Sequence, residues 1–465
     1  MKKKLLFFIS LVLFVGQLYS SQEQALPEKP IVVVIASYKN ADWYKRNLDS
    51  VFEQNYNNYR IVYVDDCSPD GTGNLVESYV TQKDQWHRFT LIKNKKRRLK
   101  MANTYMAYHE HCKDEEIVVE LDGDDWTSHK NVLANINKIY STRDVWMTYG
   151  HFMEWPTGRP QIMRSIPQSA IDNRTVRKLR GCMWAGMRTY YGWLIKRVKL
   201  EDLLYQGRFL AYTSDAAIMF PMFDMSGNRF AFVTDDMWLQ HNVKTPLNDH
   251  KVDKHGMSYR ICQFMRAKPP YPRHNESRIG FIDALDGEKV DVLVFADKNG
   301  DTGQLFNSFE CHAKNIGEIF VVNEGSVDKE FILKSCLESE NKYLLLVKDG
   351  QVLKKDIDLN LCVKLMEETG AYGFFLGVGK NGSSCPLVHE KIFDDFYGWQ
   401  FKYGKNLSDN ACGVSGTVYR KTDAHSWIDK IRSVQDLDRL ERSKEIQEKV
   451  GLFFESAVID DNEKE

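Results

Sequence analysis

The sequence of 465 residues has almost no net charge and no cysteine spacing typical of a metal site. Its 63 Lys and Arg nearly balance 64 Asp and Glu, which gives a formal net charge of −1, so no nucleic-acid partner is expected. None of the nine cysteines forms a Cys-x-x-Cys pair, and their odd number argues against a complete disulfide framework. No second long apolar run follows the one at the N-terminus, so the body of the chain is expected on one side of a membrane.

The first 21 residues have the layout of a secretory signal peptide. Lysines at positions 2–4 precede an apolar stretch over 5–15, and two serines follow at 20–21. This stretch is shorter than the roughly 20 residues of a membrane span, so residues 1–21 are expected to be a signal peptide, with an N-terminal anchor as the alternative. Such a start fits a protein that is in the secretory pathway, periplasmic or membrane-associated, and an anchored domain on the cytoplasmic face stays open.

Buried-type strands alternate with helical segments between residues 30 and 265. Three stretches are β-branched or apolar on both faces, as strands inside a parallel sheet are: residues 31–37, 60–64 and 117–121. The alternation predicts an α/β fold with a Rossmann-like, mostly parallel sheet, in which ligands bind beyond the carboxyl ends of the strands. Polar segments at 37–40, 65–71 and 122–125 follow the three strands. We therefore expect them to meet in one crevice.

The second half of the sequence repeats this pattern. A proline-rich linker is expected over 266–289, and a strand-helix-strand unit begins again at 290. Residues 343–351 correspond to 117–125, and Lys348-Asp349-Gly350-Gln351 stands where the first copy has Asp122-Gly123-Asp124-Asp125. One carboxylate cannot replace three. Residues 290–465 are therefore interpreted as a second, degenerate domain of similar type that has lost the ligand site.

The Asp122-Gly123-Asp124-Asp125 run predicts a site for a divalent cation. Hard cations prefer oxygen ligands, and two Asp separated by one small residue can turn both carboxylates toward one cavity. Gly123 is expected to let the chain turn and to leave room for a ligand. A polar turn after a strand is the alternative interpretation, and the second carboxylate pair, Asp65 and Asp66, at a neighbouring strand end favours the site. This pair can accept from a nucleotide base or a ribose hydroxyl, or it can cap a helix.

With these motifs the sequence resembles the family 2 glycosyltransferases, which have the GT-A fold. The run from Val64 to Thr72 resembles the family's Val-Asp-Asp-x-Ser-x-Asp-Gly-Thr sequence, and Asp122-Gly123-Asp124-Asp125 resembles its metal (DxD) motif. Residues 35–38 resemble its first strand and nucleoside loop, although the proline usual near Ala36-Ser37 is missing. The resemblance covers roughly residues 30–255.

The resemblance implies roles for individual residues. Donor-binding roles fall on Ser37, Asp65, Asp66, Arg97, Arg98 and Asp122, and the metal ligands would be Asp124 and Asp125, with Mn²⁺ or Mg²⁺ as the cofactor. For the two arginines a solvated basic loop is an equal alternative. The family's general base is an Asp at a helix start, and Asp215 matches that place; the alternative is that Asp215 caps a helix.

Two further positions follow from the same resemblance. A histidine near residues 246–251 often completes the metal shell, which makes His250 a candidate third ligand and His241 the alternative. Residues 187–190 resemble an acceptor-loop motif of some members.

The resemblance therefore implies a metal-dependent inverting glycosyltransferase of the hexosyltransferase type. The expected donor is a nucleotide-diphosphate sugar, with a UDP-sugar preferred, and the acceptor is a glycan, lipid or protein hydroxyl. The alternative is a non-catalytic carbohydrate-binding protein derived from a duplicated transferase. Retention of every carboxylate in the first copy favours the enzyme.

Overall fold

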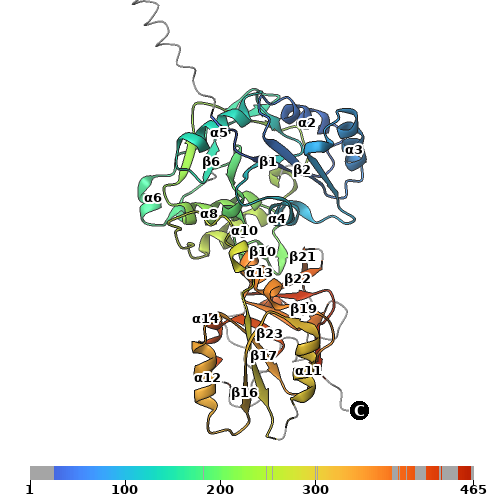
Figure 1. Cartoon of the computed structure of the whole chain (residues 1–465). Helices are drawn as coiled ribbons and strands as arrows, with labels where there is room; N and C mark the ends of the chain where they lie inside the picture. The colour runs from blue at the N-terminus through green and yellow to red at the C-terminus, as the bar shows by residue number, and fades with distance from the viewer. Residues whose placement is uncertain are drawn as a thin grey trace, which may run out of the picture.

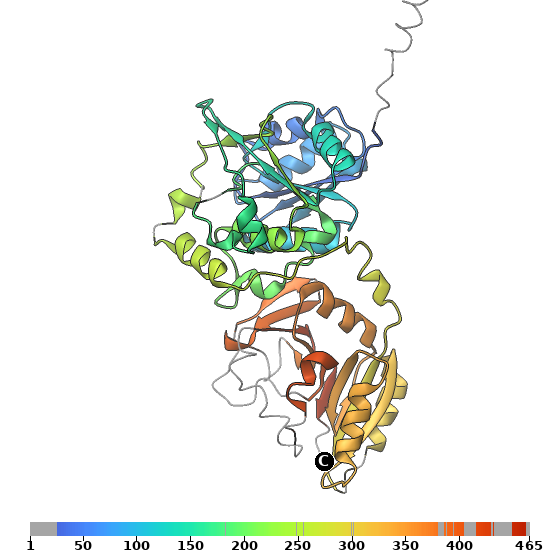
Figure 2. The same cartoon turned by 90° about the vertical axis from the view of Figure 1, so that its left-hand side faces the viewer.

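Two stacked α/β halves make up the molecule (Figures 1 and 2). The computed structural model describes residues 26–461 except 182, 248, 254, 299, 301, 380–385, 387, 394, 404–414, 429–430 and 432–448. Residues 1–21, the predicted signal peptide or anchor, lie outside this described part. Within it, no helix has the length and apolar character needed to cross a membrane. Residues 26–267 form the N-terminal half and residues 290–461 form the C-terminal half.

A seven-stranded sheet forms the centre of the N-terminal half. Its strand order is β12-β6-β9-β4-β1-β2-β3. The strands are β1 (Ile31–Ser37), β2 (Tyr59–Asp65), β3 (Phe89–Lys93), β4 (Ile117–Asp122), β6 (Met147–Gly150), β9 (Arg188–Tyr191) and β12 (Phe230–Val233). Strand β1 pairs in parallel with β2 and β4, whereas β9 runs antiparallel between β4 and β6. The predicted α/β fold with a mostly parallel sheet is confirmed.

The sheet is covered on both faces because its strands are apolar on both faces. Helices α2 (Tyr44–Phe52), α3 (Thr72–Gln82) and α5 (Val132–Thr142) pack with one hydrophobic cluster, and α4 (Leu99–His111) and α8 (Ser214–Ser226) pack with another. A small sheet, β5-β13-β7-β8, lies beside the end of β4. Its strands are β5 (Trp126–Thr127), β13 (Leu239–Asn242), β7 (Phe152–Trp155) and β8 (Pro160–Gln161).

The C-terminal half contains an eight-stranded sheet in the order β16-β14-β17-β23-β20-β24-β22-β21. The strands are β14 (Val290–Ala296), β16 (Ile316–Asn323), β17 (Tyr343–Lys348), β20 (Gly373–Gly379), β21 (Glu390–Phe393), β22 (Phe396–Gln400), β23 (Thr417–Arg420) and β24 (Val450–Phe454). From β16 to β24 this order and the strand directions match β2 to β12 of the first sheet, with β23 antiparallel where β9 is. The shared topology supports the predicted duplication, which stays a prediction, as do the domain boundaries.

Residues 266–289, the predicted linker, run from the end of α10 (Met257–Ala267) to β14 and include the 3-10 helix η4 (Asp283–Leu285). The two halves that this segment connects are in direct contact. Helix α4, on the underside of the first sheet, meets β21 and α13 (Leu359–Thr369) of the C-terminal half (Figure 1). One hydrophobic cluster runs through both halves and contains Val34 of β1 as well as Val292 of β14. The two halves therefore share a core.

Candidate active site

A cavity of about 390 Å³ opens at the carboxyl ends of β1, β2 and β4. Strand ends supply Ser37, Asp66 and Asp122 to its lining, and α4 supplies Lys100. Asp215 at the start of α8 closes another side. Segments that are far apart in sequence thus meet at this edge because parallel strands end at the same edge of a sheet. The structure brings together the three strand ends that the sequence predicts to form one crevice.

Asn47 of α2 anchors the backbone of the 122–125 segment. The side-chain amide of Asn47 donates to the carbonyl oxygens of Asp122 (3.0 Å) and Asp125 (2.7 Å). A Cβ on Gly123 would lie 2.6 Å from Nδ2 of Asn40 and 2.7 Å from Oγ of Ser37. The φ angle of Gly123 lies outside the left-handed region, so glycine is needed here for close packing against β1. The chain does turn at Gly123 and Asp124, as expected, but the close approach to β1, and not a left-handed φ angle, is what requires glycine.

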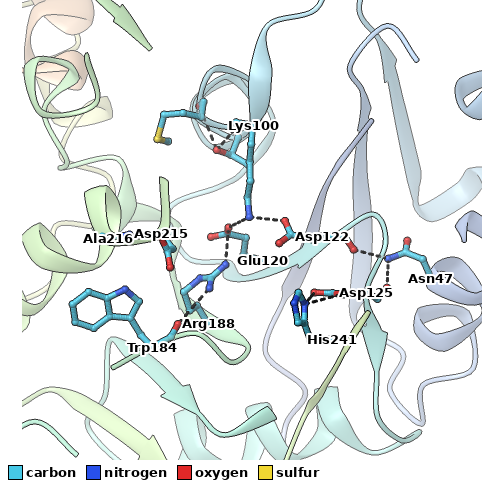
Figure 3. A network of polar contacts seen from close by, with 12 residues as sticks. Asn47, Lys100, Glu120, Asp122, Asp125, Trp184, Arg188, Asp215, Ala216 and His241 are labelled. Carbon is cyan, nitrogen blue, oxygen red and sulfur yellow. Dashed lines mark hydrogen bonds and ion pairs between the residues drawn. The ribbon is translucent and has the colours of Figure 1, made fainter. Parts of the chain in front are cut away.

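Three carboxylates, those of Asp122, Asp124 and Asp125, concentrate negative charge at this corner. Figure 3 shows Asp122 and Asp125. Burial, together with the charges of Asp125 and Asp122, raises the pKa of Asp124 to about 7. Asp125 is buried, accepts from Nδ1 of His241 (3.1 Å) and the backbone N–H of Asn242 (2.8 Å), and has a pKa raised by burial. Burial alone would lower the pKa of His241, but its hydrogen bond to Asp125 and the nearby carboxylates raise it. This corner therefore has an excess of negative charge that a cation would relieve.

The donor atoms at this corner fit a divalent cation. Among the residues that the structure describes, no three His, Cys, Asp or Glu side chains form a ready-made metal cage. Magnesium in phosphate sites commonly takes one or two protein carboxylates and completes its shell with phosphate oxygens and water. Asp124 and Asp125 can supply such ligands, and His241 is the histidine placed beside them. His250 lies in α9 (Asp249–Val252), and its side chain is outside the described part of the chain.

A network of charges around the buried Glu120 and Arg188 lies beside these carboxylates, and the sequence did not predict it. Lys100 Nζ lies 2.5 Å from Oδ1 of Asp122 and 3.0 Å from Oε1 of Glu120 (Figure 3). Glu120 also accepts from Nη2 of Arg188 (2.9 Å) and from the hydroxyl of Tyr190 (3.0 Å).

These ion pairs shift the pKa values of Glu120, Lys100 and Arg188. Burial would raise the pKa of Glu120, but Arg188 and Lys100 hold it far below its usual range. The pKa values of Lys100 and Arg188 lie above theirs, because the nearby carboxylates outweigh the cost of burial. The network therefore holds two positively charged side chains, Lys100 and Arg188, at the cavity wall. A glutamate in the middle of an apolar strand was the signal in the sequence that such partners must exist.

Asp66 and Asp65 have different surroundings. Asp66 lines the cavity and accepts from the backbone N–H groups of Arg98 (2.7 Å) and Leu99 (2.8 Å), so it caps the start of α4. Asp65 is buried, accepts from the backbone N–H of Ser68 (3.2 Å) and is not among the residues that line the cavity. The helix-cap interpretation thus describes Asp66, while its cavity position also leaves the donor role open.

Of the other residues predicted to bind the sugar donor, some line the cavity and one does not. Ser37 lines the cavity, and its Oγ accepts from the hydroxyl of Tyr63 (2.8 Å). Arg97 lines the cavity with its guanidinium 3.9 Å from the ring centroid of Tyr38, and half of its side chain is exposed. Arg98 points to the C-terminal half, where its Nη2 donates to the carbonyl of Lys391 (2.6 Å). The structure therefore places Arg97, and not Arg98, at the cavity.

Asp215 lies in the first turn of α8, on the opposite side of the cavity from Asp125 and His241 (Figure 3). Its Oδ1 contacts the backbone N–H of Ala216 (2.8 Å). Arg188 lies beside it with its Nε buried and without a hydrogen-bond partner in the described structure. A carboxylate that is fixed at a helix start and open to the cavity can accept a proton from a bound hydroxyl group.

Residues 32–204 match the model of glycosyl transferase family 2, and no curated protein matches the chain. The chain is similar to the solved structure of Staphylococcus aureus TarS 1–349 in complex with UDP-GlcNAc (16% identity, 51% of this chain and 65% of that one, TM-score 0.37). It is also similar to the Pyrobaculum calidifontis mannosyltransferase PcManGT in complex with GDP-Man and Mn²⁺ (19% identity, 49% and 63%, TM-score 0.33).

The similarity covers less than two thirds of each of these two solved chains. The family match extends from β1 past β9 and includes the 122–125 segment, and Asp215 and His241 follow it in the sequence. Residues 32–204 of this chain therefore resemble a family 2 glycosyltransferase domain.

Proposed function

We propose that this protein is a metal-dependent inverting glycosyltransferase that moves a sugar from a UDP-sugar to a hydroxyl of a glycan, lipid or protein. The observation that carries the proposal is one cavity that is lined by Asp124 and Asp125 and also, on the other side from Asp125, by Asp215. A divalent cation at that corner would supply charge neutralisation for the diphosphate. The family match over residues 32–204 supports the same reaction class.

The residues of the chain have separate tasks in this proposal. Lys100 and Arg97 place positive charge beside the carboxylate corner, where a diphosphate would bind. Asp215 takes the proton from the acceptor hydroxyl while the hydroxyl oxygen forms a bond to the anomeric carbon of the sugar. The bond from that carbon to the diphosphate breaks at the same time, and the nucleoside diphosphate leaves. Attack from the side opposite the leaving group inverts the configuration.

Calorimetry with UDP and Mn²⁺ tests the donor site. The wild-type protein should bind UDP in a Mn²⁺-dependent manner and hydrolyse a UDP-sugar slowly in the absence of acceptor. Asp124→Asn should abolish the Mn²⁺ dependence. Asp349→Asn is the matched control, because Asp349 stands at the corresponding strand end of the C-terminal half and should leave UDP binding unchanged. Binding of oligosaccharides without binding of any nucleotide diphosphate would instead favour the carbohydrate-binding alternative.

A further inference from the structure

Helix α4 connects the candidate active site to the C-terminal half. Residues Leu99, Lys100 and Asn103, near its N-terminus, line the cavity. The same helix lies on the side of the first sheet that faces the other half, above β21 and α13 (Figure 1). The position of Lys100 therefore depends on how this helix is held.

The C-terminal half holds α4 along one side. The ring of Tyr105 stacks on Phe393 of β21, with centroids 6.1 Å apart and planes 23° from parallel. The Nδ1 atom of His109 lies 2.8 Å from Oε1 of Glu368 on α13, and only 1% of the His109 side chain is exposed. Arg98, just before the helix, donates to the carbonyl of Lys391. Positions 105 and 109 are four residues apart and fall on one side of the helix, and Arg98 contacts Lys391 in the same strand as Phe393, so these contacts form one continuous seam.

The cavity side of the same segment is under backbone strain. Leu99 has a φ angle of 69°, in the left-handed region that a branched side chain rarely adopts. Asp66 holds the backbone N–H groups of residues 98 and 99, and Lys100 Nζ bonds to Asp122. A strained segment persists only when surrounding contacts fix it. The seam with β21 and α13 provides such contacts from the opposite side.

We propose that the C-terminal half is a positioning element for the donor site, which acts by fixing α4. Glu368 and Phe393 are its positioning residues: they touch α4 and do not line the cavity. This inference rests on the proposed function, since it assigns Lys100 and the 97–99 segment to donor binding. It also assigns a function to the C-terminal half, which has Lys348-Asp349-Gly350-Gln351 at the strand end where the N-terminal half has the carboxylate motif.

Two variants and a matched control test this proposal. Glu368→Ala and Phe393→Ala should each weaken the binding of UDP with Mn²⁺ about tenfold, within the range of roughly 5- to 150-fold usual for coupled sites. The KM for the donor should rise more than kcat falls. Lys449→Ala breaks another contact between the halves, at 3.4 Å from Glu201, which does not involve α4; it should leave UDP binding unchanged. Glu368→Gln keeps an oxygen that can accept from His109 and should restore binding.

Hydrogen exchange measures the positioning without a ligand. Backbone amides over 97–104 should exchange faster in Glu368→Ala and Phe393→Ala, while amides in β1 and β14 keep wild-type rates and report intact folding. Equal exchange over 97–104 in these variants, in Lys449→Ala and in the wild type would overturn the inference. If the wild type binds no UDP, the proposed function fails, and the exchange rates alone decide whether the C-terminal half orders α4.

Discussion

Replacement of Glu120 by glutamine should cost about 3 kcal/mol of folding free energy. Glu120 is 3% exposed and lies 2.9 Å from Arg188, of which 9% is exposed. Loss of one partner from a buried ion pair costs roughly 3–5 kcal/mol, because the other charge stays buried without compensation. The lower end applies here, since the glutamine oxygen can still accept from Arg188 and since Lys100 keeps Asp122 as its partner.

The sign of the pH dependence provides a second check on this reasoning. The folded-state pKa of Glu120 lies far below its unfolded value of about 4.3, because Arg188 and Lys100 stabilise the charged form. Its contribution to stability is therefore fully present above pH 4.3 and is lost as the pH falls toward the folded-state pKa. The stability difference between the wild type and Glu120→Gln should be largest near pH 7 and should shrink below pH 4.3.

Urea denaturation followed by circular dichroism at several pH values measures both quantities. Asp144→Asn is the control, because Asp144 pairs with Arg229 at the surface and is 77% exposed, and such pairs contribute about 0–1 kcal/mol. A loss below about 1 kcal/mol in Glu120→Gln at pH 7, or a difference that grows toward low pH, would refute the assignment of a buried, charged Glu120.

Other outcomes follow from the same cavity. Asp215→Asn should lower kcat for transfer about 10²- to 10⁴-fold and leave UDP affinity within about twofold, as measured by acceptor-dependent UDP release, because a general base acts only on the acceptor. Gly123→Ala should cost about 1–3 kcal/mol in urea denaturation, because its methyl group would lie 2.6 Å from Asn40 Nδ2; equal stability would show that β1 can shift. Mn²⁺ affinity should fall about tenfold per pH unit below about 7, where a proton competes for Asp124, and pH-independent titrations would contradict the raised pKa.

The sequence predicted the sheet and the place of the site because both depend on local patterns. Uninterrupted β-branched strands must be buried on both faces, and their polar ends must then meet at one edge. The partners of Glu120 were not predictable in this way. They come from β9, which enters the sheet antiparallel beside β4, and from α4, so their identity depends on tertiary pairing.

The two adjacent arginines show the same limit. Arg97 and Arg98 have equal local signals, yet one lines the cavity and the other bonds to the C-terminal half. Only the contact of Arg98 with the C-terminal half distinguishes the two side chains. The role of Asp66 as a cap depended on a helix that begins more than 30 residues later in the chain.

The hydrophobic cluster that runs through both halves has a consequence for how the protein unfolds. Val34 and Val292 belong to the same cluster, so one face of each sheet is covered by a core that both halves share, while each half also has a cluster of its own. Melting should then be a single cooperative transition, and cleavage in the 266–289 segment should leave two fragments that stay associated. Separately produced fragments would expose apolar surface and aggregate. We therefore expect the pair of halves, and not either half alone, to be the smallest stable unit.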